Sequence, residues 1–307
     1  MRSSEERAPT CRSCLLALLT VVVGFRSIGS VLHVWVAKMK LAKRVKKLSQ
    51  LLNQTRSRML GRMSKPTKTV RVFADDVWLV SYPKSGNTWG RFLVGTLFNP
   101  SEPITFENLK RRVPDIYRHT DEELQKRSRP RLIKSHEQNF GHYPKTLYFV
   151  RDPRAVFVSY YYHMKREKMI SDSETMDHLL DAFLSGKLGP FGRWDRHVQS
   201  WIHAANVLIV KYENLISKPR SEVQRMLEYL NLQLEDETIV DTIKWSSADH
   251  MRNLEINSPG SFTRQRTDIP FVRRALADNW HEELKASLVH RIEKKFARTM
   301  RQLGYRP

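Results

Sequence analysis

The chain has 307 residues, 40% of them hydrophobic, an ordinary value for a soluble globular protein and enough to bury a substantial core. Its formal net charge of +21 is unevenly placed, because residues 1–72 carry 16 Lys/Arg and two acids whereas the other 235 residues carry a net +7. The only cysteines, Cys11 and Cys14, provide at most half of a zinc site, and the chain beyond them cannot form a disulfide.

Residues 1–70 form a basic N-terminal extension with a marginal hydrophobic segment at residues 15–37. Arg26 and His33 interrupt that segment, and an arginine in the middle of a bilayer is unfavourable. We therefore predict a cytoplasmic protein, with a membrane anchor through residues 15–37 as the alternative. In residues 38–63, apolar residues at helical spacing alternate with lysines, which indicates either a basic helix in peripheral contact with an acidic membrane or a solvated linker helix.

A proline and polar residues at 64–69 place a domain boundary near residue 70, so residues 71–307 form the main domain. Strands are predicted at Val77–Tyr82, Arg131–Ser135, Thr146–Val150 and Val207–Tyr212, and helices at Thr88–Phe98, Arg154–Met164, Met176–Leu184, Arg193–Ala205, Glu222–Leu230, Glu235–Trp245 and His281–Leu303. This alternation predicts an α/β fold, a three-layer sandwich with a central parallel sheet that binds its ligand at the carboxyl ends of the strands.

The segment YPKSGNTW, residues 82–89, joins the first predicted strand to the first predicted helix. A tight turn before a helix presents backbone N–H groups to an anion, and the helix dipole favours negative charge there. Lys84 adds a positive charge; the other candidate phosphate partners in the loop are Ser85, Gly86, Asn87 and Thr88. The lysine precedes the glycine, unlike in the nucleotide-binding G-x-x-x-x-G-K-S/T loop. The segment resembles the phosphosulfate-binding loop of sulfotransferases that use 3′-phosphoadenosine 5′-phosphosulfate (PAPS).

A second motif, RLIKSH at residues 131–136, is a strand that ends in a lysine and a histidine. Lys134 and His136 alternate with Ser135, so both side chains are expected on the same side of the strand end. Histidine suits the role of base for a hydroxyl because its usual pKa lies near neutrality. The arrangement resembles the K-S/T-H motif of cytosolic-type sulfotransferases, which implies that His136 deprotonates the acceptor.

The third motif runs from Leu147 to Tyr160 and places Arg151 at the tip of a strand. Asp152 is expected to cap the following helix, and Pro153 to occupy its first turn. The segment resembles the sulfotransferase R-D/N-P motif, which implies that Arg151 and Ser159 hold the 3′-phosphate of the cofactor. An arginine can meet phosphate oxygens with two hydrogen bonds, and a serine adds one donor.

Three weaker similarities concern the nucleotide. The strand that ends at Tyr212 resembles the Y-E-D-L motif of the same family, which implies that Tyr212 lies beside the adenine; Trp89 is expected to stack on the base, and Ser246 to contact the adenine side. Residues 270–280 resemble the R-K-G-x-x-G-D-W segment, in which Arg273 and Arg274 would form a second clamp on the 3′-phosphate. Ala275 and Asp278 replace the two glycines, so we expect a reshaped or weaker contact there. The dimer-forming pattern of many cytosolic members is absent, which leaves the oligomeric state open.

The resemblance covers residues 77–280 and implies a fold similar to that of P-loop nucleotide kinases. It also implies transfer of a sulfuryl group from PAPS to a hydroxyl or amine. His136 would act as the general base, while Lys84 and Lys134 would stabilise the developing charge. PAPS is the expected cofactor, and no metal is expected.

Two alternatives remain open. A nucleotide or small-molecule kinase would need a magnesium-binding acid and a Walker-type loop, and neither is apparent; a basic membrane- or nucleic-acid-binding protein would act through the N-terminal extension, although no specific nucleic acid is expected. The acceptor, a small molecule, glycan or lipid, is not specified by the sequence. Residues 164–200, with Phe140, His142 and Tyr143, are expected on its side of the site. A basic rim would favour an acidic acceptor such as a glycan, unless these charges are only solvated surface.

Overall fold

The computed structural model describes residues 66–141, 143–257 and 268–307. Chain contacts divide the protein into Met1–Arg62 and Met63–Pro307, and the second unit contains all of the described residues. The predicted hydrophobic segment, the predicted basic helix and His142 lie outside the described residues, so the expectations about them stay predictions. Among the helices of the described ranges, none is long and apolar enough to cross a membrane.

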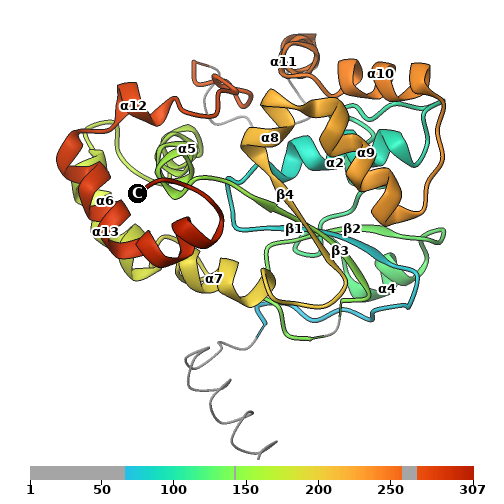
Figure 1. The fold of residues 1–307 in the computed structure, drawn as a ribbon, viewed down its shortest axis with the longest axis horizontal. Helices are drawn as coiled ribbons and strands as arrows, with labels where there is room; N and C mark the ends of the chain where they lie inside the picture. Colours follow the sequence, from blue (N-terminus) through green and yellow to red (C-terminus); the bar gives the residue numbers. More distant parts are fainter. Residues whose placement is uncertain (1–65, 142, 258–267) are drawn as a thin grey trace, which may run out of the picture. The chain divides into compact units, whose positions relative to one another are not determined.

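Four strands form one parallel sheet with the order β2-β1-β3-β4 (Figure 1). They are β1 (Val77–Ser81), β2 (Leu132–Ser135), β3 (Lys145–Val150) and β4 (Val207–Lys211), each within one residue of the predicted bounds. Leu79 pairs with Lys134 on one side and with Leu147 on the other. Because all four strands run in the same direction, the loop after β1 and the ends of β2 and β3 lie at one edge of the sheet.

The side chains of the strands alternate between two hydrophobic cores. Val77, Leu79, Leu147 and Phe149 belong to one core, and Trp78, Val80, Tyr148 and Val150 belong to the other. A sheet with both faces buried needs strands that are apolar at nearly every position, which explains the continuous apolar runs in the sequence. The predicted α/β fold with three layers is confirmed.

One face of the sheet is covered by α2 (Asn87–Leu97), α9 (Pro219–Leu230) and α10 (Asp236–Trp245), and α8 (Tyr212–Ser217) directly follows β4 (Figure 1). Gly90 allows α2 to approach the sheet closely, because a Cβ atom at this position would lie 2.3 Å from the ring of Phe149. The start of α2, and with it the loop after β1, is thereby fixed against β3.

The other face is covered by α5 (Pro153–Arg166), α6 (Met176–Ser185), α7 (Trp194–Trp201) and α13 (Ala286–Gln302) (Figure 1). The side chain of Asp152 accepts a hydrogen bond from the backbone N–H of Arg154, and Pro153 is in the first turn of α5, as the sequence predicted. Arg151 is thus held immediately before a capped helix.

Four short or medium helices were not predicted: α3 (Leu109–Arg112), α4 (Asp121–Gln125), α8 and α11 (Ala248–Asn257). α12 (Trp280–Glu283) lies at the start of a longer predicted helix. The prediction of one helix over His281–Leu303 was wrong, because the chain is extended at Leu284 and separates α12 from α13. Trp280, Leu284 and Leu288 are all buried in one core at spacings of four residues, so the apolar pattern does not reveal the break.

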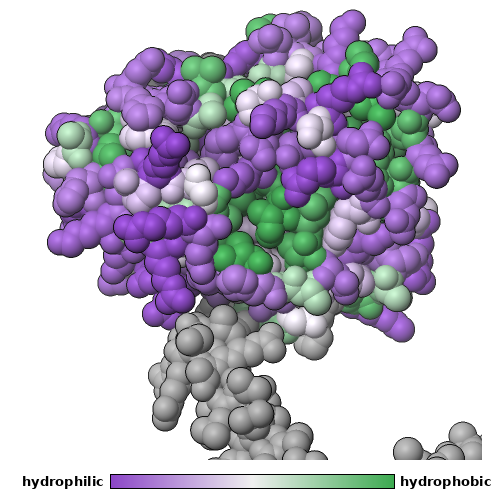
Figure 2. Space-filling view, viewed as in Figure 1, coloured by the Kyte–Doolittle hydropathy of each residue, from purple (hydrophilic) through white to green (hydrophobic). Residues whose placement is uncertain are grey.

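The face of the molecule in Figure 2 is mainly hydrophilic, with hydrophobic residues gathered near its middle, where Figure 1 draws β4. β4 is an edge strand of the sheet, and its Val207, Leu208 and Ile209 are only half-buried. These half-buried residues do not line the site; the functional side chains lie at the carboxyl ends of the four strands, where Tyr212 directly follows β4.

Candidate active site

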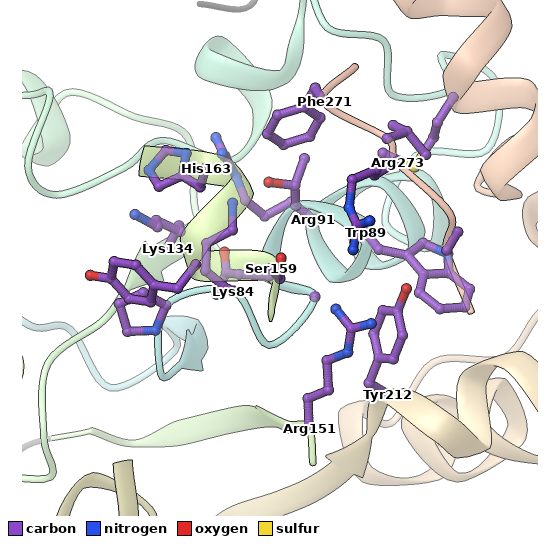
Figure 3. Close-up of a pocket in the computed structure, with 18 of the residues that line it drawn as sticks. Lys84, Trp89, Arg91, Lys134, Arg151, Ser159, His163, Tyr212, Phe271 and Arg273 are labelled. Carbon is purple, nitrogen blue, oxygen red and sulfur yellow. The ribbon is translucent and has the colours of Figure 1, made fainter. Parts of the chain in front are cut away.

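A cavity of about 410 Å³ lies at the carboxyl ends of the strands. Its walls come from the loop after β1, the ends of β2 and β3, the inner face of α5, the start of α8, and the segment that precedes α12. Lys84, Lys134 and His163 lie toward one end of the cavity, and Trp89, Tyr212 and Arg273 lie toward the other (Figure 3).

The loop after β1 has the geometry of an anion cradle. Lys84 and Gly86 both have left-handed backbone conformations, with φ of 71° and 89°. A Cβ atom on Gly86 would lie 2.6 Å from the ring of Tyr212, so only glycine allows this packing. The first turn of α2 has no acidic residue and no side-chain cap, which leaves its N–H groups and dipole to an anion.

Two polar side chains of this loop are buried. The amide of Asn87 donates to the carbonyl of Leu79 at 3.1 Å, so one end of this side chain anchors the loop to β1. The hydroxyl of Ser85 is buried and has no hydrogen-bond partner among the described residues. Unlike Lys84, Gly86, Asn87 and Thr88, Ser85 is not among the residues that line the cavity, although a buried unpaired hydroxyl is unfavourable unless a ligand pairs with it.

Lys84 and Lys134 are two amines at the same end of the cavity (Figure 3). Burial, followed by the charges of Arg166 and Arg151, lowers the pKa of Lys84 to about 8. Burial also lowers the pKa of Lys134 to about 8, although its ion pair with Asp115 at 2.8 Å opposes this shift. An anion that binds between two such amines stabilises their protonated form and raises their pKa values again.

The imidazole of His136 is fixed in one orientation. Its Nδ1 lies 2.7 Å from the carbonyl oxygen of Ser81, which can only accept, so Nδ1 carries the proton and Nε2 is unprotonated. Burial, and then the charge of Lys134, lowers the pKa of His136 well below its usual value. The ring is therefore neutral at pH 7, and Nε2 can accept a proton from a group in the cavity.

Contacts with neighbouring side chains hold His136 in place. Its backbone N–H donates to the hydroxyl of Tyr117 at 3.0 Å, and its carbonyl accepts from Nε2 of His197 at 2.9 Å. The ring of Tyr117 is nearly parallel to the imidazole, and Phe191 lies 5.4 Å from it. The base is thus supported from three segments that are distant in sequence.

The other end of the cavity combines an arginine with two aromatic rings. The guanidinium of Arg151 lies 4.0 Å above the centre of the Tyr212 ring and donates to the carbonyl of Leu276 at 3.0 Å. Its Nε is buried without a hydrogen-bond partner in the described part of the chain. Trp89 and Tyr212 meet edge to face at 5.3 Å, and Ser159 lines the same cavity. These groups fit a phosphate beside an aromatic base.

The predicted second clamp lines the cavity, but its charges are already paired. Arg273 forms an ion pair with Glu283 at 2.8 Å, and Arg274 pairs with Glu282. Ala275 has φ of 54°, a left-handed conformation that favours glycine. Ala275 thus occupies the position of a glycine in the sulfotransferase pattern, and its backbone has the left-handed conformation that glycine adopts most easily.

Ser246 does not line the cavity. It is buried at the end of α10, and its hydroxyl donates to the carbonyl of Thr242 at 2.8 Å. Of the segment 164–200 only Phe191 lines the cavity, and Tyr143 packs on Trp78 in the core, with ring centres 4.7 Å apart. The expectation that these stretches form the acceptor side was too broad.

Several lining residues were missed by the sequence analysis: Arg91, Lys110, Asp115, Arg118, Tyr160, His163, Met251, Phe271 and Asn279. His163 lies one helical turn after Ser159 on α5, and that spacing could have indicated it. Asp115 and Arg118 are in an irregular segment that bridges to Lys134 beside β2, and no motif marks it. Across the described ranges, no three His, Cys, Asp or Glu side chains are grouped as metal ligands.

Comparison with known proteins identifies the family. The model of the sulfotransferase domain family matches residues 74–304. Sulfotransferase 1A1 of Canis lupus familiaris is 27% identical over 255 residues, which cover 75% of this chain and 85% of that protein. Sulfotransferase 2B1 of Mus musculus is 30% identical over 241 residues, which cover 71% of this chain and 69% of that protein.

Solved structures share the fold. The mouse sulfotransferase SULT7A1, crystallised with PAP, has a TM-score of 0.61 at 22% identity, over 76% of this chain and 86% of that one. Retinol dehydratase, in complex with androsterone and the inactive cofactor PAP, has a TM-score of 0.64 at 17% identity, over 78% of this chain and 84% of that one. Because the family match covers most of the chain, and because the predicted motifs converge on one cavity, this chain belongs to the sulfotransferase family and is a sulfotransferase enzyme.

Proposed function

We propose that this sulfotransferase moves the sulfuryl group of PAPS to a hydroxyl or amine of an acceptor, with His136 as the general base. The observation that carries this proposal is the orientation of the His136 ring: Nδ1 donates to the Ser81 carbonyl, and Nε2 remains as an acceptor beside the two lysines of the cavity. PAP, with which SULT7A1 and retinol dehydratase were crystallised, is the desulfated form of the proposed donor.

The donor would occupy the long axis of the cavity. Arg151 and Ser159 would hold its 3′-phosphate, for which the unpaired Nε of Arg151 is the supporting observation. Trp89 and Tyr212 would contact the adenine. The loop after β1 would hold the phosphosulfate through the N–H groups at the start of α2, through the buried hydroxyl of Ser85 and through Lys84.

The remaining clamp residues would require a local exchange of partners. Arg273 and Arg274 can reach a phosphate only if they leave Glu283 and Glu282 or share their hydrogen bonds with them. We therefore assign the main role at the 3′-phosphate to Arg151, and a supporting role to Arg273, Arg274 and the backbone at Ala275.

In the proposed reaction, Nε2 of His136 takes the proton of the acceptor hydroxyl as the acceptor oxygen forms a bond to sulfur. The bond between sulfur and the oxygen of the 5′-phosphate breaks, and its electron pair stays on that oxygen. Lys84 and Lys134 stabilise the negative charge that develops along this line. Their positions are set before the donor binds, so little reorganisation is needed during the transfer.

A thermal-shift titration of the full chain tests the donor assignment. PAP at 100 times its dissociation constant should stabilise the protein by about 2.7 kcal/mol, and AMP should do so much less at the same concentration. Arg151→Gln should abolish the difference between PAP and AMP. Arg298→Gln, an exposed arginine on α13 for which the described residues provide no ion pair, is the matched control and should behave as wild type.

Other outcomes would redirect the assignment. Stabilisation by ATP with Mg²⁺ but not by PAP would favour the kinase alternative and refute the PAPS proposal. A folded protein that responds to no nucleotide would refute both. The cytoplasmic location, the peripheral membrane contact and the expectation that no metal is needed stay predictions.

A further inference from the structure

The cavity carries more positive charge than the proposed donor needs. Eight of its lining side chains are lysine or arginine and one, Asp115, is acidic; the eight are Lys84, Arg91, Lys110, Arg118, Lys134, Arg151, Arg273 and Arg274. PAPS brings about four negative charges at neutral pH, from one terminal phosphate and the phosphosulfate. The surplus must either be balanced by the protein or be available to a second ligand.

Four of these cations already have protein partners. Lys134 pairs with Asp115, Arg273 with Glu283, and Arg274 with Glu282. Arg91 is buried and donates to the backbone carbonyls of Val113 and Leu109, where it holds the chain on either side of α3. These four are therefore structural, or can reach the donor only by exchanging partners.

The other four, Lys84, Arg151, Lys110 and Arg118, form no ion pair within the described ranges. Lys84 and Arg151 belong to the proposed donor site. Lys110 and Arg118 have no assigned function, yet both line the cavity while their side chains are exposed at its rim. An exposed arginine at the rim of a cavity can bind a charged ligand without paying the large desolvation penalty of a buried one.

Arg118 lies on the acceptor side. It directly follows Tyr117, whose hydroxyl accepts from the backbone N–H of His136 and whose ring lies parallel to the imidazole, with ring centres 6.3 Å apart. Its charge is also one of those that act on Lys134, beside the proposed point of transfer. Because the base must touch the acceptor hydroxyl, Arg118 is placed to meet another group of the same acceptor.

The walls beside the base combine aromatic rings with charged side chains. Phe191 provides one aromatic face near His136, and Tyr160 adds a second ring. Phe271 adds a third ring, whose centre lies 5.8 Å from the ammonium nitrogen of Lys84, and the lining also includes Lys110, Asp115, Arg118 and His163. Asp115 does not repel an anion strongly, because the ammonium group of Lys134 lies 2.8 Å from it. A wholly apolar acceptor would make no use of Lys110 and Arg118, the two cations at the rim that form no ion pair with the described residues.

We infer that the acceptor is an anionic alcohol, for example a sugar that bears a carboxylate, whose hydroxyl meets His136 and whose anionic group pairs with Arg118 and Lys110. This inference rests on the proposed function and specifies its substrate class. The planar guanidinium of Arg118 suits a carboxylate, which it can bind with two parallel hydrogen bonds. Lys110 adds a second, less directional charge.

The test compares two acceptors that differ in one group: p-nitrophenyl β-D-glucuronide and p-nitrophenyl β-D-glucoside. Their dissociation constants are measured by calorimetry on the full-length protein saturated with PAP, and their transfer rates with PAPS are measured in parallel. We expect the glucuronide to bind about tenfold more tightly or better, as for a charge-assisted hydrogen bond. A third acceptor, the 6-sulfate of the glucoside, carries a negative charge without a carboxylate. If it binds as tightly as the glucuronide, the site requires only negative charge; if it binds more weakly, the site requires a carboxylate.

Variants locate the effect. Arg118→Gln should remove most of the preference for the glucuronide, Arg118→Lys should restore part of it, and Lys110→Gln should reduce it several-fold. Arg298→Gln is the control for charge and exposure and should leave the preference unchanged. PAP binding should be the same in all four variants, because none of the three positions belongs to the proposed donor site.

Equal binding of the two glycosides, or binding of neither by a protein that still binds PAP, would overturn the inference and leave the proposed function in place. A preference that Arg118→Gln does not change would overturn it as well. Loss of PAP binding in the wild-type protein would instead count against the proposed function, so the two failures are distinguishable.

Discussion

Replacement of Ala275 by glycine should stabilise the protein. Ala275 has φ of 54°, a region that costs an L-residue about 1–2 kcal/mol relative to glycine. Glycine offsets part of this stabilisation, because its greater conformational freedom lowers the free energy of the unfolded chain by about 0.4–1 kcal/mol. The net gain should be about 0.5–1 kcal/mol, or a rise of about 1–4 °C in Tm for a domain of this size.

Ala277, two residues later in the same segment, is the matched control because it is not among the residues with positive φ. Ala277→Gly only increases the conformational freedom of the unfolded chain, so it should destabilise the protein by about 0.4–1 kcal/mol. The assay is urea unfolding of both variants and of wild type. If the m-value is the same in all three proteins, a change in the unfolding midpoint reports a change in stability. The predicted signature is a pair of changes with opposite signs.

Destabilisation by Ala275→Gly equal to that by Ala277→Gly would refute this reasoning, because it would show that residue 275 is not held in a left-handed conformation. The same variant also tests the function of the segment. Leu276 supplies the carbonyl that receives a hydrogen bond from Arg151, so a relaxed backbone at 275 acts on the proposed phosphate site. We expect Ala275→Gly to bind PAP more tightly than wild type, since glycine allows the backbone to approach a phosphate more closely.

Three further predictions concern the loop and the base. Gly86→Ala should abolish PAP binding and lower Tm, because the new Cβ would lie 2.6 Å from the ring of Tyr212 and residue 86 has φ of 89°. A wild-type Kd for PAP in a folded Gly86→Ala variant would contradict the loop geometry. His136→Asn keeps a hydrogen-bond donor toward the Ser81 carbonyl but removes Nε2, the proposed proton acceptor. Turnover should therefore fall by about 10²-fold or more, while PAP should still raise Tm as in wild type. Unchanged turnover would remove His136 from the mechanism. Lys84 and Lys134 have pKa values lowered to about 8 and must be charged to hold the donor, so PAP affinity should be highest near pH 7 and fall by about tenfold per pH unit above pH 8 for one linked proton. Calorimetry in buffers of different ionisation enthalpy should show proton uptake at pH 8, and an affinity that stays constant from pH 7 to pH 9.5 would refute this prediction.

The sheet and the cavity edge could be predicted because their signals are local. Strands buried on both faces read as continuous apolar runs, so all four were found within a residue of their ends. Two helix starts could also be predicted from a few adjacent residues: Gly86 precedes α2, and Asp152 followed by a proline begins α5. The side chains that follow such strands must then share one edge of a parallel sheet.

Less could be predicted where contacts join distant segments. Ser246 was expected at the adenine, but the folded chain does not place it among the residues that line the cavity, and its hydroxyl donates to a carbonyl of its own helix. The break between α12 and α13 was invisible, because Leu284 is buried at the same spacing whether or not the helix continues. In both cases the sequence pattern fits two local conformations equally well, and packing against other elements selects one.

The sequence by itself determined the order of the four strands and the helices between them that were predicted, the loop that cradles an anion, and the identity of the lysines, the histidine and the arginine at the strand ends. Only the tertiary structure decided which charges of the cavity are already paired: Lys134 with Asp115, and Arg273 with Glu283. It also decided that the Ser81 carbonyl holds His136 with Nε2 unprotonated. Propensity and periodicity act between near neighbours in the chain, whereas a proton or an ion pair is positioned by groups from separate segments that only the folded core brings within 3 Å of one another.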